Sequence, residues 1–130
     1  MSDIAILVEF KTQFTSFFDE LIAQFPNEGD LVVMRLYIAT QMDIQDAVHT
    51  FIYLMDTNNG ESRKAVKDRN EGHFLRYDID PSTNEKYRLS HFKKLWKSGK
   101  LDDEDKGIIW QWIDTFIFLS DKYTRAKGGS

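Results

Sequence analysis

The sequence predicts an all-α protein, folded as a single compact bundle of about five to seven helices. Apolar residues recur at steps of three and four along most of the chain, as they do on amphipathic helices. Turn residues divide these runs into segments of helical length. The 130 residues are 42% apolar and include ten phenylalanines, which suffices for one hydrophobic core. We therefore expect one helical domain over residues 1–126, followed by a flexible tail over residues 127–130.

The first expected helix covers residues 4–25. Ser2 or Asp3 stands at the N-cap position, where a side-chain oxygen can accept a hydrogen bond from the first turn. Pro26 ends the helix, because proline disfavours helical geometry in the residue before it. The apolar stripe of this helix comprises Leu7, Phe10, Phe14, Phe17, Leu21 and Phe25.

The second expected helix covers residues 30–40, with Asp30 as its N-cap. The β-branched and aromatic content of residues 32–38 leaves a strand as a minor alternative. The side chains expected to face the core are Leu31, Met34, Tyr37 and Ile38.

A third helix is expected to begin at Asp43, and Asp46 lies in its first turn, where the helix dipole favours negative charge. The sequence leaves open whether residues 41–42 separate it from the second helix. Residues 56–60 have the composition of a turn, so we expect the helix to end before them. Its apolar face comprises Ile44, Val48, Phe51, Ile52 and Met55.

Residues 61–76 are polar and weakly periodic, which predicts one or two short helices with a break near Gly72. Residues 78–84 have the composition of a loop. Ser90 is expected to cap a further short helix, and Gly99 is expected to end it in the left-handed conformation. The apolar side chains of that helix are Phe92, Leu95 and Trp96.

The last expected helix begins at Asp102, and three further acids fill its first turn. Its body is apolar on most sides, which indicates either a central place in the core or contact with a partner. Because the first and last helices are the longest and most apolar, we expect them to form the central pair. One side of the last helix carries Ile109, Trp112, Ile113, Phe116 and Tyr123, and Ile108, Trp110, Ile117 and Phe118 lie around it.

The sequence contains none of the residue patterns that are typical of catalytic or metal-binding sites. The chain has no cysteine and no nucleophile elbow, P-loop or dinucleotide-binding glycine motif. The polar segments 56–60 and 78–84 depart from the glycine and glutamate positions of a calcium-binding EF-hand loop. We therefore expect a protein that is not an enzyme, with no catalytic residues, cofactor or bound metal. The histidines lack the paired spacing of metal sites, and we expect His73 and His91 at the surface and His49 at the edge of a helix face.

The net charge of −4 divides unevenly, with −7 on residues 1–60 and +3 on residues 61–130. Residues 86–100 contain six bases and no acid, interleaved with aromatic side chains. Lysines beside aromatic rings suit phosphate contact and base stacking, so nucleic-acid binding through residues 63–69 and 86–100 is the alternative function. The overall acidity argues against a dedicated nucleic-acid-binding protein. The residues of this alternative are Arg63, Lys64, Lys67, Arg69, Lys86 and Arg88.

A protein partner is the favoured hypothesis, because aromatic residues make up 14% of the chain. Trp110 and Trp112 are two residues apart on the last helix and therefore point in different directions. If one of them lies in the core, the other is expected to approach the surface, where tryptophan is a common interface anchor. The residues expected to bind the partner are Trp110, Trp112, Lys93, Lys94, Lys97 and Lys100.

Three segments carry a resemblance to a known group of proteins: FTSFFDELIAQFPNEGDL (14–31), RNEGHFL (69–75) and FKKLWKSGKLDDEDKGIIWQWIDTFIFLSDKY (92–123). Together they resemble small uncharacterised helical proteins of nucleocytoplasmic large DNA viruses, including algal and mimivirus-like viruses. No activity and no catalytic residue is established for that group, so the resemblance assigns none to this chain. The resemblance implies a viral protein that works inside an infected cell, in the host cytoplasm or the viral factory. We expect it to be a viral regulatory or assembly factor.

Composition adds expectations about location and partners. The absence of cysteine suits a reducing, intracellular compartment, and the first ten residues do not have the pattern of a secretory signal. No stretch approaches the ~20 apolar residues of a membrane span, so we expect no membrane partner. We expect a protein partner, with nucleic acid as the alternative, and the sequence leaves a homo-oligomer open.

Overall fold

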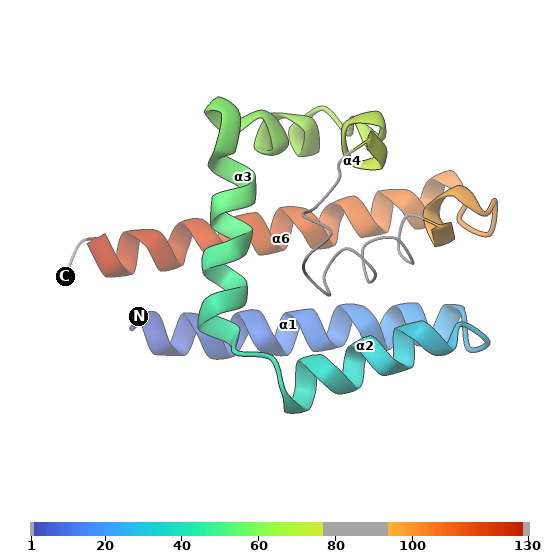
Figure 1. The fold of residues 1–130 in the computed structure, drawn as a ribbon, viewed down its shortest axis with the longest axis horizontal. Coiled ribbons are helices and arrows are strands. Elements are labelled where there is room, and N and C mark those ends of the chain that lie inside the picture. The colour runs from blue at the N-terminus through green and yellow to red at the C-terminus, as the bar shows by residue number, and fades with distance from the viewer. Residues whose placement is uncertain (1, 77–93, 129–130) are drawn as a thin grey trace. The chain divides into compact units, whose positions relative to one another are not determined.

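The computed structural model describes residues 2–76 and 94–128, and over these residues the fold is all-α (Figure 1). The predicted fold class is therefore confirmed. The strand considered for residues 32–38 is wrong, because these residues are helical. A separate short segment, residues 94–97, is also helical. The named helices are α1 (Asp3–Gln24), α2 (Gly29–Thr40), α3 (Ile44–Lys67), α4 (Glu71–Arg76) and α6 (Asp103–Gly128).

The chain divides into two compact units. The first unit is Met1–Leu54 with Asp114–Ser130, and the second unit is Met55–Ile113. The helices α3 and α6 each contribute residues to both units. The single domain expected over residues 1–126 stays a prediction. The helix α6 continues to Gly128, so helical backbone includes the first two residues of the expected tail.

In the first unit, α1 begins and ends where the sequence predicts. Ser2 is the N-cap, and its Oγ accepts a hydrogen bond from the backbone amide of Ala5 at 3.2 Å. The helix ends at Gln24, with Phe25 as the C-cap immediately before Pro26. These local signals therefore fix both ends of the helix to within one residue.

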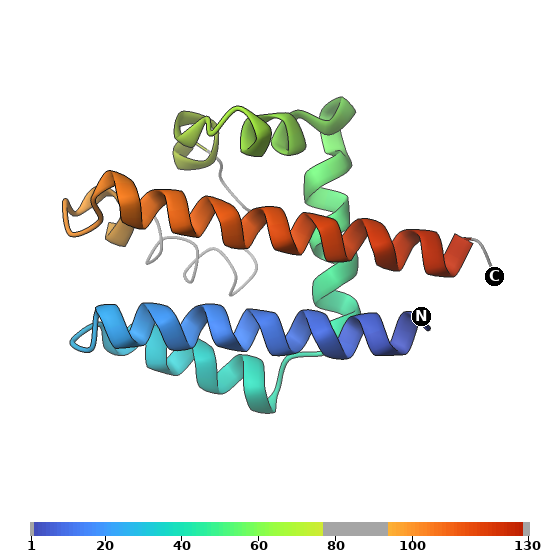
Figure 2. The same ribbon diagram turned by 180° about the vertical axis from the view of Figure 1, so that it is seen from behind.

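The helix α2 lies beside α1 in both views of the ribbon (Figures 1 and 2). It begins at Gly29, with Glu28 at the N-cap position, so the expected cap at Asp30 is wrong by two residues. Asp30 lies in the first turn instead, where its charge still meets the positive end of the helix dipole. At the other end, the amides of Gln41 and Met42 both donate to the carbonyl of Tyr37, at 2.9 and 3.0 Å. A break therefore does separate α2 from α3.

Aromatic rings join α1 to the part of α6 that belongs to the first unit. The centroid of the Phe116 ring lies 5.3 Å from that of Phe10, 5.4 Å from that of Phe14 and 5.9 Å from that of Phe17. Such pairs add to the gain from burying apolar area. Within this unit the first and last helices pack together as the sequence predicts. Its most buried apolar residues include Ile6, Phe18, Leu21, Leu31, Ile38, Val48, Leu119 and Tyr123.

The helix α3 does not end at the turn expected over residues 56–60. Helical hydrogen bonding continues to Lys67, but Asn59 and Gly60 have φ of 61° and 76°. Asparagine and glycine are the residues that best tolerate this left-handed region. The ribbon changes direction in the second half of the helix (Figure 1). The turn residues therefore bend the helix rather than end it.

The break expected near Gly72 lies three residues earlier. Arg69 adopts φ 54°, and the amide of Asn70 donates to the carbonyl of Ala65 at 2.8 Å. This pattern closes the end of α3 as a Schellman motif. Gly72 lies inside α4. The prediction was wrong because the chain reverses at an arginine, a residue that seldom adopts this conformation and whose guanidinium lies over the distant Trp110.

The start of α6 follows the predicted pattern. Gly99 has φ 82°, as expected for a left-handed helix end. The amide of Asp105 donates to Asp102 Oδ1 at 2.8 Å, and the amide of Asp102 donates to Asp105 Oδ2 at 3.2 Å. This reciprocal pair is a capping box, which satisfies two amides that the helix leaves unpaired. The expected loop over residues 78–84 and the expected cap Ser90 lie outside the described residues.

Two glycine substitutions are expected to change stability in opposite directions. Gly99→Ala should lower the free energy of unfolding by about 1 kcal/mol, because alanine resists a φ of 82°. Gly107→Ala should raise it by up to about 1 kcal/mol, because Gly107 is helical and a Cβ there meets nothing within 4 Å. Urea unfolding followed by circular dichroism measures both. Equal effects of the two substitutions would contradict the assignment of Gly99 as a left-handed helix end.

Candidate interaction surfaces

Trp110 is a core residue of the second unit, with only 7% of its surface exposed. Its ring meets Trp96 edge to face at 5.6 Å between centroids and lies 5.9 Å from Phe74. Trp112 is partly exposed. The expected division between the two neighbouring tryptophans therefore appears, with Trp110 inside and Trp112 nearer the surface. As folded, Trp110 is not an accessible anchor, so of this pair only Trp112 keeps that proposed role.

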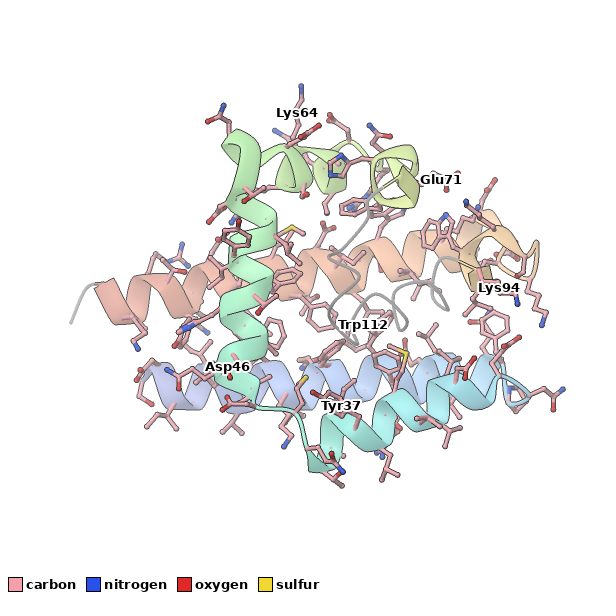
Figure 3. All side chains as sticks on the ribbon, in the orientation of Figure 1. Tyr37, Asp46, Lys64, Glu71, Lys94 and Trp112 are labelled. Atoms are coloured by element: carbon pink, nitrogen blue, oxygen red, sulfur yellow. The ribbon has the colours of Figure 1, made fainter. Side chains whose placement is uncertain are left out.

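Glu71 connects three segments of the second unit. Its Oε2 accepts a hydrogen bond from the indole Nε1 of Trp96 at 2.8 Å and lies 3.5 Å from the Nζ of Lys106. The same ammonium group lies 5.3 Å from the centre of the Trp96 ring. Figure 3 labels Glu71 on α4. A buried indole N–H needs an acceptor, so this carboxylate stabilises the core. The sequence analysis did not identify Glu71 as a residue of this kind.

Exposed lysines of the second unit lie on two separate described segments, α3 and residues 94–100. Lys94, Lys97 and Lys100 are exposed, and so are Lys64 and Lys67 on α3. Lys64 and Lys94 extend from different sides of this unit in Figure 3. The remaining expected bases, Lys86, Arg88 and Lys93, lie outside the described residues.

The two arginines proposed for phosphate contact are engaged within their own unit. Both Nε and Nη2 of Arg63 donate to Asp56 Oδ1, at 3.3 and 3.0 Å. The Nη1 of Arg69 donates to the carbonyl of Val66 at 3.1 Å, and its guanidinium lies 5.7 Å from the centre of the Trp110 ring. These contacts stabilise the bent end of α3, and a phosphate would have to compete with them.

The structure corrects the expectation for one histidine. His73 is largely buried, with 12% of its side chain exposed, and shares a 3.0 Å hydrogen bond with the buried Ser62. The expectation of a surface histidine was wrong because α4 folds back against α3 within the second unit. His49 shares a 3.0 Å hydrogen bond with the hydroxyl of Tyr123, and His91 lies outside the described residues. Among the described residues no group of three metal-ligating side chains gathers.

The outward face of α2 is exposed and uncharged, and the sequence prediction did not single it out. Its apolar side chains are Val32, Val33 and Leu36, which are 49%, 66% and 60% exposed. Leu31 and Ile38 bury the opposite side of the helix. We define the α2 face as these three apolar residues together with the exposed Gly29, Ala39 and Thr40.

The charged residues of α2 stand at the edges of this face. Arg35 is ion-paired with Asp19 of α1, and Asp30 lies in the first turn. The signal for the α2 face was present in the sequence, because α2 has apolar residues on all sides. A helix of that kind has more apolar surface than one core contact can cover.

No protein-family model, curated protein or solved structure matches this chain. The resemblance to proteins of large DNA viruses therefore stays a prediction. Within residues 2–76 and 94–128, no helix is long and apolar enough to cross a bilayer.

Proposed function

We propose that this protein is a non-enzymatic interaction module that binds a protein partner, with the α2 face as its principal contact. The supporting observation is the exposure of Val32, Val33 and Leu36 on a helix whose outward side carries no charge. A surface helix normally presents polar residues to water, so apolar side chains that share its exposed side favour contact with another molecule. The resemblance noted above supports the context of a viral regulatory or assembly factor inside an infected cell.

A protein partner accounts for this surface better than nucleic acid does. The α2 face offers no cation to a phosphate, and the first unit contains ten acids and five bases. In the second unit Trp96 and Trp110 are buried, so neither ring can stack on a base as folded. The exposed Lys94, Lys97 and Lys100 support the nucleic-acid alternative. Together with Trp112, they also remain proposed contacts for a protein partner.

Paired substitution of the α2 face tests this proposal. Val33→Gln with Leu36→Gln removes apolar surface, keeps the net charge and retains good helix formers. Affinity capture from expressing cells is carried out with and without nuclease. The wild type should recover a protein partner in both cases, and the double variant should recover it in neither. The matched control is Tyr53→Gln, which replaces an exposed apolar residue of α3 in the same unit.

The control should capture the same partner as the wild type, and circular dichroism should show that both variants fold like the wild type. Capture that the double variant leaves unchanged would remove α2 from the proposal. Capture that disappears with nuclease would favour the nucleic-acid alternative.

A further inference from the structure

We infer that the partner docks on the α2 face with a short amphipathic helix, which has apolar residues on one side and lysine or arginine beside them. This inference rests on the proposed function above and adds the chemistry of the docking segment. The observations behind it are the shape of the α2 face, its lack of charge and the acidity of the unit that carries it.

The shape of the α2 face suits a single helix. A helix of twelve residues is about 18 Å long. Val32 and Leu36 are one turn apart, with Val33 beside them, so they form a short apolar ridge. Gly29 and Ala39 lie near the two ends and have little or no side chain, which lets another helix approach closely. Helices in such contacts meet through apolar residues at steps of three, four and seven.

Charge selects a basic partner. The first unit, Met1–Leu54 with Asp114–Ser130, has a net charge of −5. The α2 face itself is neutral. The exposed Asp30 stands at its N-terminal edge, and Arg35, at another edge, is ion-paired with Asp19. A neutral apolar centre within an acidic unit attracts a segment whose apolar side is flanked by lysine or arginine. Complementary charge of this kind raises the association rate and excludes acidic competitors.

A second copy of this chain fits the α2 face less well. Two copies would bring two units of net charge −5 together, and this repulsion opposes association. The α2 face measures about 18 Å by roughly 10 Å, or on the order of 180 Å², whereas a stable interface needs about 800 Å² from each partner. A face of this size can form the centre of a contact with a short helix.

Three synthetic peptides of fifteen residues test the inference directly. The first has leucines at helical spacing with lysine flanks. The second keeps the leucines and replaces the lysines with glutamates. The third keeps the lysines and replaces the leucines with serines. Binding of each fluorescently labelled peptide to the full chain is measured by anisotropy at low and moderate salt.

The leucine–lysine peptide is expected to bind about tenfold more tightly than either of the others, and more weakly as salt rises. Val33→Gln with Leu36→Gln should weaken this binding by about tenfold, and Tyr53→Gln should leave it unchanged. The double variant keeps the charge of the chain, so its effect isolates the apolar contact from general attraction between a basic peptide and an acidic protein.

Four results would overturn the inference. Equal binding of the glutamate peptide would remove the charge requirement, and binding that survives the double variant would place the peptide elsewhere. Self-association of the chain that the double variant abolishes would make a second copy the occupant. Absence of peptide binding would exclude this chemistry. None of these results decides whether capture of a protein partner depends on α2, so the proposed function is judged separately.

Discussion

Replacing Phe116 with alanine is expected to lower the free energy of unfolding by about 3–5 kcal/mol. The ring of Phe116 is buried and lies against Phe10, Phe14 and Phe17, at centroid distances of 5.3 to 5.9 Å. Truncation removes the contacts that join α6 to α1 and leaves a cavity that these rings can fill only in part. Urea unfolding followed by circular dichroism measures the loss.

The matched control is Phe118→Ala on the same helix. Phe118 is 57% exposed, and Lys122 lies 5.8 Å from the centre of its ring. Its truncation should cost no more than about 0.5 kcal/mol, as is usual for surface substitutions. A Phe116→Ala variant that is no less stable than Phe118→Ala would contradict the aromatic contact between α1 and α6.

The same variant also tests whether the chain unfolds as one domain. All three tryptophans lie in Met55–Ile113, so their fluorescence reports on the second unit, whereas Phe116 lies in the first. Circular dichroism reports on helices of both units. Because α3 and α6 each run through both units, we expect the two signals to shift together. A shift in circular dichroism without a shift in fluorescence would contradict the single domain predicted over residues 1–126.

Local signals in the sequence predicted the helix ends well where the controlling atoms lie within a few residues. Ser2 caps α1, and the amide of Asp46 donates to Asp43 at the start of α3. Gly99 ends a helix and Asp102 begins one as expected. Each of these depends on a side chain or a backbone angle that the neighbouring residues determine.

The sequence failed where contacts between distant residues decide the structure. Arg69 reverses the chain in a conformation that favours glycine, with its guanidinium over Trp110, forty-one residues further on. His73 is largely buried and shares a hydrogen bond with Ser62 on the preceding helix. The α2 face was missed for another reason. Leu31 and Ile38 lie in the core as predicted, but spacing does not show whether the remaining apolar residues of the helix stay exposed or are covered by another part of the fold.

Trp110→Ala is the second substitution expected to have a large effect, lowering the free energy of unfolding by about 3–5 kcal/mol. Trp110 is buried between Trp96 and Phe74, with the guanidinium of Arg69 over its ring. Its removal leaves a cavity beside Trp96 and Phe74 in the core of the second unit. It also takes the ring contact away from an arginine held at φ 54°, a conformation that is costly for residues other than glycine.

Trp112→Ala provides the comparison, because Trp112 is two residues away on the same helix and is partly exposed. It should cost clearly less stability than Trp110→Ala, and circular dichroism under urea measures both. If Trp112 is a partner contact, its substitution should weaken capture of the partner while the chain stays folded. If Trp110→Ala cost no more than Trp112→Ala, the assignment of Trp110 to the core would be wrong, and Trp110 would again be a candidate for the interface.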